Sequence, residues 1–239
     1  DAGGGGGRIA LVYDPAEQSN MAPHTISIRT YPRKQAGDDT AGCLGTLWLS
    51  DAQFLFEPVS RYSGALFIPG FTNWFCNNLT ISNSWIDIRT TNRFLLTVTN
   101  DLRIIFADTA QFFSRLDLSN AVIVVGHDLF ITNAADTRDD RAGLSLFAGA
   151  TNSAAEEYGS LLQVGGTLTI ASNCWLDPYA HPVNGAGVKM MVGNLALAQG
   201  GEINATTTNS NRDKQNVLKG YAEAMGSGAA TVTRRGGGY

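Results

Sequence analysis

An acid, a tyrosine and a histidine lie close together between residues 177 and 182. Asp177, Tyr179 and His181 alternate there with two prolines and an alanine. A carboxylate and an imidazole within hydrogen-bond reach are groups that general acid–base catalysis uses. No nucleophile for this pair is identified by spacing, and the prolines favour a rigid loop that turns the chain back towards Val188. We therefore assign no catalytic residue and take these three as candidate carbohydrate contacts.

Acidic residues of the segment 133–158 could ligate a cation. Asp136, Asp139 and Asp140 offer the oxygen ligands that calcium prefers. Successive charges usually mark a solvated surface, and the sequence has no Asp-x-Asp-x-Asp-Gly loop and no nonapeptide calcium repeat. The sequence predicts no metal site and no cofactor, with a structural calcium ion at these three residues as the alternative.

Two adjacent aromatic residues, Trp74 and Phe75, fall in the turn predicted for residues 73–78. Aromatic rings on a surface can stack on sugar rings, whereas aromatic residues on the apolar face of a strand more often fill the interior. Because this pair is expected in a turn, we place both residues on the surface as further candidate carbohydrate contacts.

The elements that must position these residues belong to a repeat. A turn residue followed by an apolar-x-apolar triplet begins at Leu79, Leu102, Leu129, Leu168 and Leu195, so the spacings are 23, 27, 39 and 27 residues. Self-similarity at a period of about 20 to 50 residues indicates a solenoid. The leucines are expected to stack on one another as rows of the interior.

Within each repeat, further two-residue alternations predict two or three short strands separated by Gly, Asn, Asp or Ser. Short strands of period two in a repeat of about 25 residues are typical of a parallel β-helix, in which equivalent strands stack about 4.8 Å apart. The long interval predicts an ordinary coil with a loop insertion near residues 133–158. Very little helix is expected.

Composition supports one elongated domain over residues 1–239. The sequence has 44% hydrophobic residues, 16% charged residues and 27 glycines. The predicted domain divides into N-terminal strands (1–72), regular coils (73–205) and a polar, glycine-rich tail (206–239). A net charge of −4 without a basic stripe excludes a nucleic-acid partner. No apolar run approaches the length of a membrane span, and three cysteines without C-x-x-C spacing indicate neither a zinc site nor a disulfide scaffold.

The two ends of the chain resemble a known family. The run Gly3-Gly4-Gly5-Gly6-Gly7-Arg8-Ile9-Ala10-Leu11-Val12-Tyr13 is similar to the phrase that closes repeat blocks in glycine-rich bacterial surface proteins of the pectin-lyase-like, right-handed β-helix class. Residues 193–205 resemble the phrase that opens such blocks, and the Thr-rich and charged run after them departs from it. The resemblance implies a right-handed parallel β-helix, an extracellular or cell-surface, adhesin-like role, and a segment of a longer array.

The same class includes polysaccharide hydrolases and lyases. Hydrolases of the polygalacturonase type use Asn-Thr-Asp, Asp-Asp, Gly-His-Gly and Arg-x-Lys in that order. Here Gly126-His127-Asp128 precedes Asp139-Asp140, and the first and last motifs are absent. Since a fold does not imply a function, these residues are not assigned to catalysis.

Two functions are therefore expected. The first is a non-enzymatic structural or adhesive β-helix element, which copies of itself extend end to end into a fibre because the terminal strands leave unpaired edges. The alternative is a β-helix that binds or cleaves polysaccharide along its flank. The expected self-association residues are the terminal glycines Gly3, Gly4, Gly5, Gly6, Gly7, Gly236, Gly237 and Gly238.

Overall fold

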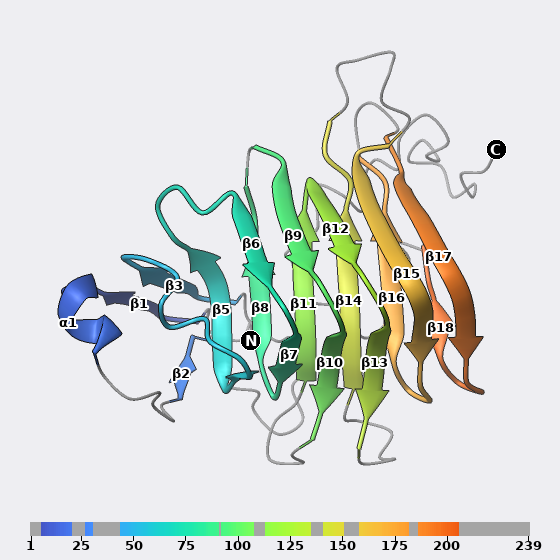
Figure 1. Ribbon diagram of the computed structural model, residues 1–239, viewed down its shortest axis with the longest axis horizontal. Helices are drawn as coiled ribbons and strands as arrows, with labels where there is room; N and C mark the ends of the chain where they lie inside the picture. Colours follow the sequence, from blue (N-terminus) through green and yellow to red (C-terminus); the bar gives the residue numbers. More distant parts are fainter. Residues whose placement is uncertain are drawn as a thin grey trace, which may run out of the picture.

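The structure, a computed structural model, is an all-β chain whose strands lie side by side along its long axis (Figure 1). It describes residues 6–20, 27–30, 44–90, 92–107, 113–134, 141–150, 158–181 and 186–205. Within these ranges every strand pair is parallel, and the strands form two nine-stranded sheets, neither of which closes on itself. The predicted all-β class and parallel strands are confirmed.

The first sheet follows the order β1-β3-β5-β8-β11-β14-β16-β18, with β2 paired to β5. Its strands are β1 (Arg8–Leu11), β2 (Ile28–Arg29), β3 (Thr46–Leu49), β5 (Tyr62–Phe67), β8 (Trp85–Ile88), β11 (Phe113–Ser119), β14 (Arg141–Phe147), β16 (Trp175–Tyr179) and β18 (Glu202–Ile203).

The second sheet follows the order β4-β7-β10-β13-β15-β12-β9-β6, with β17 paired to β15. Its strands are β4 (Val59–Ser60), β6 (Asn73–Cys76), β7 (Leu79–Ser82), β9 (Phe94–Val98), β10 (Leu102–Phe106), β12 (Ala121–Val125), β13 (Leu129–Asn133), β15 (Ser160–Ile170) and β17 (Val188–Leu197). The long strand β15 joins its two arms, because it pairs first with β12 and then with β13. β17 pairs with both halves of β15, and the register shifts between Val164 and Thr167.

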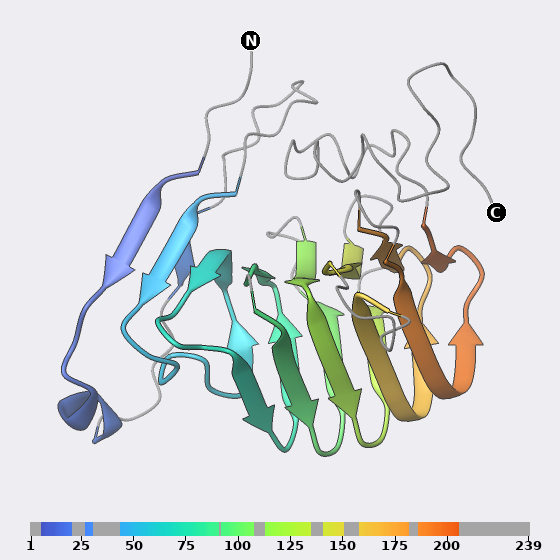
Figure 2. The same ribbon diagram turned by 90° about the horizontal axis from the view of Figure 1, so that it is seen from above.

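Successive repeats use the sheets in a fixed order. The chain runs from a strand of the first sheet, such as β8, to β9 and then β10 in the two arms of the second sheet, and it returns to the first sheet at β11. Figure 2 shows these successive loops along the axis of the molecule. Strands of an internal repeat therefore lie next to their equivalents from the preceding and following repeats.

The predicted leucine rows are confirmed by the register of the second sheet. Leu102 pairs with Leu79 and with Leu129, and Leu168 pairs with Leu129 and with Leu195. Side chains alternate across a strand, so each leucine points to the same face as its equivalents. The side chains of Leu79, Leu102, Leu129 and Leu168 are at most 2% exposed. They belong to the core between the two sheets.

Tight corners connect the two sheets through residues with a left-handed backbone. Asn83 (φ 48°) precedes β8, Asn120 (φ 52°) separates β11 from β12, and Asn173 (φ 58°) precedes β16. Asparagine tolerates this conformation better than most residues because its short amide can hydrogen-bond locally. The Oδ1 of Asn83 accepts a hydrogen bond from the N–H of Ala107 at 3.0 Å, which links the corner to the next repeat.

The predicted insertion near residues 133–158 needs a correction. Strand β14, at residues 141–147, lies inside that range and pairs with β11 and β16 on its two edges. The extra chain of this repeat therefore lies between β14 and β15, where residues 148–159 replace the single Asn120 that joins β11 to β12. The alternation of Leu144 and Leu146, both fully buried, already predicts this strand, so the bounds of the insertion were drawn too wide.

A short helix at the N-terminal end was not predicted. Helix α1 (Pro15–Ser19) begins after Asp14, whose carboxylate accepts a hydrogen bond from the N–H of Ala16 at 2.8 Å. An aspartate at the N-cap followed by a proline is a helix-start signal, so the sequence did carry the information.

In the described part of the chain, no helix is long and apolar enough to cross a membrane.

Candidate polar site on the outer face of the first sheet

Charged and aromatic side chains gather on the outer face of the first sheet, which we call the polar face. Its core-facing neighbours Ile86, Leu116, Leu144 and Leu176 are fully buried between the sheets, so the alternating residues point outward. The outward residues are buried as well. They are Trp85 and Asp87 of β8, Arg115 and Asp117 of β11, Ser145 and Phe147 of β14, and Trp175, Asp177 and Tyr179 of β16.

A row of carboxylates crosses the polar face. The strand register places Asp87 beside Asp117, Asp117 beside Ser145, and Ser145 beside Asp177. Neighbouring members are therefore about 4.8 Å apart at the backbone. All three carboxylates are at most 3% exposed, and a buried carboxylate is costly unless hydrogen-bonded or paired with a cation.

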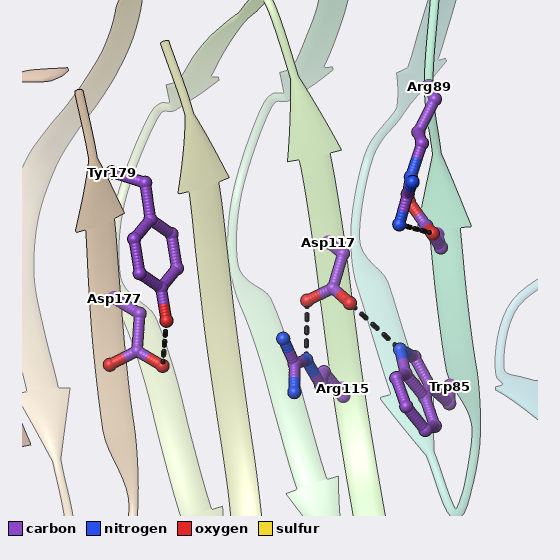
Figure 3. Close-up of polar contacts among 7 residues, drawn as sticks. Trp85, Arg89, Arg115, Asp117, Asp177 and Tyr179 are labelled. Atoms are coloured by element: carbon purple, nitrogen blue, oxygen red, sulfur yellow. Dashed lines mark hydrogen bonds and ion pairs between the residues drawn. The ribbon is translucent and has the colours of Figure 1, made fainter. Parts of the chain in front are cut away.

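Arg115 and Asp117 form the central pair of this row (Figure 3). The Nε of Arg115 donates to Oδ1 of Asp117 at 2.6 Å, and the indole N–H of Trp85 donates to Oδ2 at 2.8 Å. The guanidinium also lies over the Trp85 ring, 5.2 Å from its centroid. Burial disfavours the charged guanidinium, but Asp117, together with Asp177 and Tyr179, outweighs this effect and raises the pKa of Arg115 above its ordinary value.

Asp87 is held differently from Asp117. It forms an ion pair with Arg89 at 2.8 Å, but that guanidinium is 45% exposed whereas the carboxylate is 2% exposed. Burial, reinforced by the negative charge of Asp117, raises the pKa of Asp87 from 3.8 to about 6, although Arg89 and Arg115 oppose the shift. The row therefore contains one carboxyl group that keeps its proton to an unusually high pH.

The other end of the row is aromatic. The Tyr179 hydroxyl lies 3.4 Å from Oδ2 of Asp177, and the Tyr179 ring stacks on Phe147 at a centroid distance of 4.8 Å. Glycine is required at position 143, because a Cβ there would lie 2.1 Å from the buried ring of Trp175. In the described residues the hydroxyl of Ser145 is buried without a hydrogen-bond partner.

The chemistry of the polar face can be compared with that of glycoside hydrolysis, which uses one protonated carboxyl group and one ionised carboxylate. Asp87 and Asp117 are neighbours across two strands, and Asp87 has a raised pKa. Their burial and their bonds to Arg89, Arg115 and Trp85 also describe a network that is satisfied within the chain. The described residues of this face therefore make a buried network, in which neither carboxylate is open to a substrate.

The predicted carbohydrate contacts are only partly brought together. Asp177 and Tyr179 lie in strand β16 and are at most 4% exposed, so the predicted proline-stiffened loop is wrong for them. Pro178 is tolerated in β16 because its nitrogen faces away from β14, on the edge where, among the described residues, β18 pairs only with Trp175 and Leu176. His181 lies just after the strand, half-buried, and its N–H donates to the carbonyl of Ala186 at 2.7 Å.

Trp74 and Phe75 are separated by the pleat of strand β6. Trp74 is 7% exposed and joins the core, with its ring centroid 6.0 Å from that of Phe71. Its predicted surface position is wrong, because residues 73–76 form a strand and a strand sends adjacent side chains to opposite faces. Phe75 is 72% exposed, as predicted.

The predicted metal alternative, Asp136, Asp139 and Asp140, lies outside the described residues. Among those described, no group of three acidic, histidine or cysteine side chains could hold a metal ion. Cys76 and Cys174 are free thiols, and burial raises the pKa of each to about 11.

Of the predicted self-association glycines, Gly6 and Gly7 alone are described. A Cβ at Gly6 would lie 1.8 Å from the carbonyl oxygen of Thr30, so the close backbone approach at this glycine is made within the chain. Gly3, Gly4, Gly5, Gly236, Gly237 and Gly238 lie outside the described residues.

The Gly126-His127-Asp128 motif has a structural position. It forms the corner between β12 and β13, where Oδ1 of Asp128 accepts the N–H of Thr167 from the next repeat at 2.6 Å. In the repeat before, Oδ1 of Asp101 accepts the N–H of Asp128 at 3.3 Å. These aspartates hold successive repeats together by accepting hydrogen bonds from backbone amides.

A recurring four-residue pattern in the sequence marks the strands of the polar face, and it is not among the motifs considered above. Trp85-Ile86-Asp87-Ile88, Arg115-Leu116-Asp117-Leu118 and Trp175-Leu176-Asp177-Pro178 share one pattern, a large polar or aromatic residue, an apolar residue, aspartate and an apolar residue. Aligning the repeats by their strands in place of their leading leucines would have revealed it.

Comparison of the chain with protein-family models, with curated proteins and with solved structures finds no match. The polar face and the repeat are therefore the grounds on which a function can be argued.

Proposed function

We propose that the chain forms a right-handed parallel β-helix that serves as a non-enzymatic structural or adhesive element outside the cell. The observation that carries the proposal is the in-register pairing of each repeat with the next, from Leu79 through Leu102, Leu129 and Leu168 to Leu195. Such stacking makes stability grow with every added repeat, which suits a long scaffold. Right-handedness is favoured because crossovers between parallel strands almost always take that hand.

Two further features support a scaffold over an enzyme. The buried acids of the polar face are engaged by groups of the same chain, Asp87 by Arg89, Asp117 by Arg115 and Trp85. The extracellular location is supported by few charged residues and by the abundance of Gly, Ser, Thr and Asn.

Electron microscopy tests this proposal. Purified chain is expected to appear as short rods of uniform width, and antibodies against it are expected to label the surface of intact cells that make it. Compact particles without a long axis, or label confined to the cell interior, would contradict the structural proposal.

Polysaccharide binding or cleavage is the second candidate, and one observation favours it. Asp87 and Asp117 are register partners on neighbouring strands, and Asp87 has the raised pKa that a general acid needs. Exposed Phe75 of β6 adds an aromatic ring on the flank.

Affinity electrophoresis through gels that contain a panel of polysaccharides, with an assay for released reducing ends, separates the two candidates. If the chain binds sugar at its flank, Phe75→Ala weakens the retardation and Leu95→Ala, an exposed residue of the neighbouring strand β9, leaves it unchanged. If no polysaccharide retards the chain and no reducing ends are released, the polysaccharide candidate is wrong and the structural function remains.

A further inference from the structure

The row of acidic residues on the polar face is interrupted by one serine. Ser145 of β14 is the register partner of Asp117 on β11 and of Asp177 on β16, so a carboxylate stands on each side of its hydroxyl. In Figure 3, Oδ1 of Asp117 and Oδ2 of Asp177 lie on the sides that face β14. A serine side chain ends one bond closer to the backbone than an aspartate side chain, so the row is lowest between these two oxygens.

Aromatic rings bound the same place along β14. Gly143 and Phe147 lie two residues before and after Ser145, on the same face of the strand. The indole of Trp175 fills the space over Gly143, where a Cβ would lie 2.1 Å from the ring. On the other side, the ring of Phe147 stacks on Tyr179 at a centroid distance of 4.8 Å. The hydroxyl of Ser145 is therefore enclosed by two carboxylates and by aromatic rings.

This hydroxyl differs from those of the other fully buried serines. Among the described residues it has no hydrogen-bond partner, although Ser145 is 0% exposed. By contrast, Ser84, Ser114 and Ser160, also 0% exposed, each donate to a backbone carbonyl at 2.7–2.9 Å. Native proteins satisfy nearly all buried polar groups, and ordered water does so where no protein group is within reach. A buried, unpaired hydroxyl between two carboxylates therefore points to a small polar ligand.

We propose that one ordered water molecule is bound between Asp117 and Asp177. It accepts a hydrogen bond from the hydroxyl of Ser145 and donates one to each carboxylate. These three bonds match the number that a buried water typically makes. A carboxylate has about four lone-pair sites, so each aspartate can accept this bond in addition to those that it already makes.

The charges of the polar face favour water over a metal ion at this place. The guanidinium of Arg115 bonds to Asp117 at 2.6 Å, and Asp177 is among the groups that raise the pKa of Arg115. A cation between the two carboxylates would be repelled by this buried positive charge. Calcium needs about six to eight oxygen ligands, and no group of three acidic, histidine or cysteine side chains in the described chain could hold a metal ion.

The bound water makes the row continuous across β14. It joins the half that contains Arg115 and Asp117 to the half that contains Asp177 and Tyr179, which share no hydrogen bond among the described residues. The inference goes beyond the proposed function, because it holds whether the chain is a scaffold or binds polysaccharide.

The sign of a change in thermal stability tests the inference. If water satisfies the hydroxyl, Ser145→Ala removes a hydrogen bond and is expected to lower the unfolding midpoint by about 2–4 °C. Ser160→Ala is the matched control, because its equally buried hydroxyl donates to the carbonyl of Phe147 at 2.8 Å, and its midpoint is expected to fall. Removing an unsatisfied hydroxyl is instead favourable. A Ser145→Ala midpoint equal to or above that of the wild type would therefore overturn the inference.

A high-resolution crystal structure of the full chain identifies the ligand directly. The expected result is one isolated peak about 2.8 Å from Oγ of Ser145 and from one oxygen of each aspartate. Six or more oxygens at about 2.3–2.6 Å would identify a cation, and a side chain in that place would mean that the chain satisfies the hydroxyl itself. Either result, or no peak, would overturn the inference and would leave the proposed structural function intact.

Discussion

Asp87 makes the stability of the protein depend on pH in an unusual direction. Its pKa is raised to about 6 in the folded state, so the folded state holds the proton more tightly than the unfolded state. Its contribution to stability is therefore fully present below about pH 4 and is lost as the pH rises through about 6. Most carboxylates, which are paired with cations, act in the opposite sense.

Asp87→Asn should remove this loss, because asparagine resembles the protonated acid. Relative to the wild type, the variant is expected to gain on the order of 2 kcal/mol of unfolding free energy between pH 4 and pH 7. Urea denaturation at the two pH values measures it. An equal difference between variant and wild type at both pH values would show that Asp87 titrates normally.

The stability of the fold is expected to depend on Asp117 only while Arg115 is present. Asp117→Asn leaves a buried guanidinium without its anion, and this should cost roughly 3 kcal/mol of unfolding free energy. The double variant Arg115→Met, Asp117→Leu removes both charges and should recover most of that loss. Urea unfolding of the two variants decides the matter, and a double variant as unstable as the single one would show that the pair itself stabilises the fold.

At the residue scale, the sequence allowed prediction of side chains that repeat their own type and failed for those that do not. The leucine rows could be predicted because an apolar residue recurs at the same position of every repeat. Arg115 and Asp177 differ in type from their register partners, and their place in the polar face becomes visible only when strands about 30 residues apart are placed in register. Trp74 was misplaced because a turn was assumed where a strand forms.

Among the elements, the corners carry strain that one side chain relieves. Asn83 has φ 48°, and its amide oxygen accepts the N–H of Ala107. Asn83→Ala should cost about 2 kcal/mol, because it loses the bond and keeps a Cβ in the left-handed region. Asn83→Gly should cost less, since glycine adopts that backbone freely. Thermal unfolding ranks the two variants, and equal losses would mean that the hydrogen bond alone matters.

Strands with regular alternation were predictable at this scale, whereas their exact ends were not. The long strand β15 runs through Gly165 and Gly166, where the sequence indicates a turn. A Cβ at Gly165 would lie 2.3 Å from the carbonyl oxygen of Gly126, so this glycine permits close stacking of repeats at the corner. A glycine pair signals a turn and a close backbone approach equally well, and only the neighbouring repeat distinguishes them.

For the whole molecule, the period of the leucines was sufficient to predict the parallel stacking of repeats. It was not sufficient to predict the exposure of Leu195 and Leu197, because that depends on whether another part of the chain packs over them. The sequence around these two leucines is similar to that around their buried equivalents in the preceding repeats.

The central claim is that residues one repeat apart lie side by side on parallel strands, and engineered disulfides measure this most directly. Arg103 and Phe130 are register partners on β10 and β13, whereas Thr80 is one strand further from Phe130. In a background with the native cysteines changed to alanine, Arg103→Cys with Phe130→Cys is expected to form a disulfide on mild oxidation, because paired backbones about 4.8 Å apart fall within disulfide reach. Thr80→Cys with Phe130→Cys, about twice as far apart, is expected to remain reduced. A disulfide in the second variant and none in the first would contradict the stacking of the repeats.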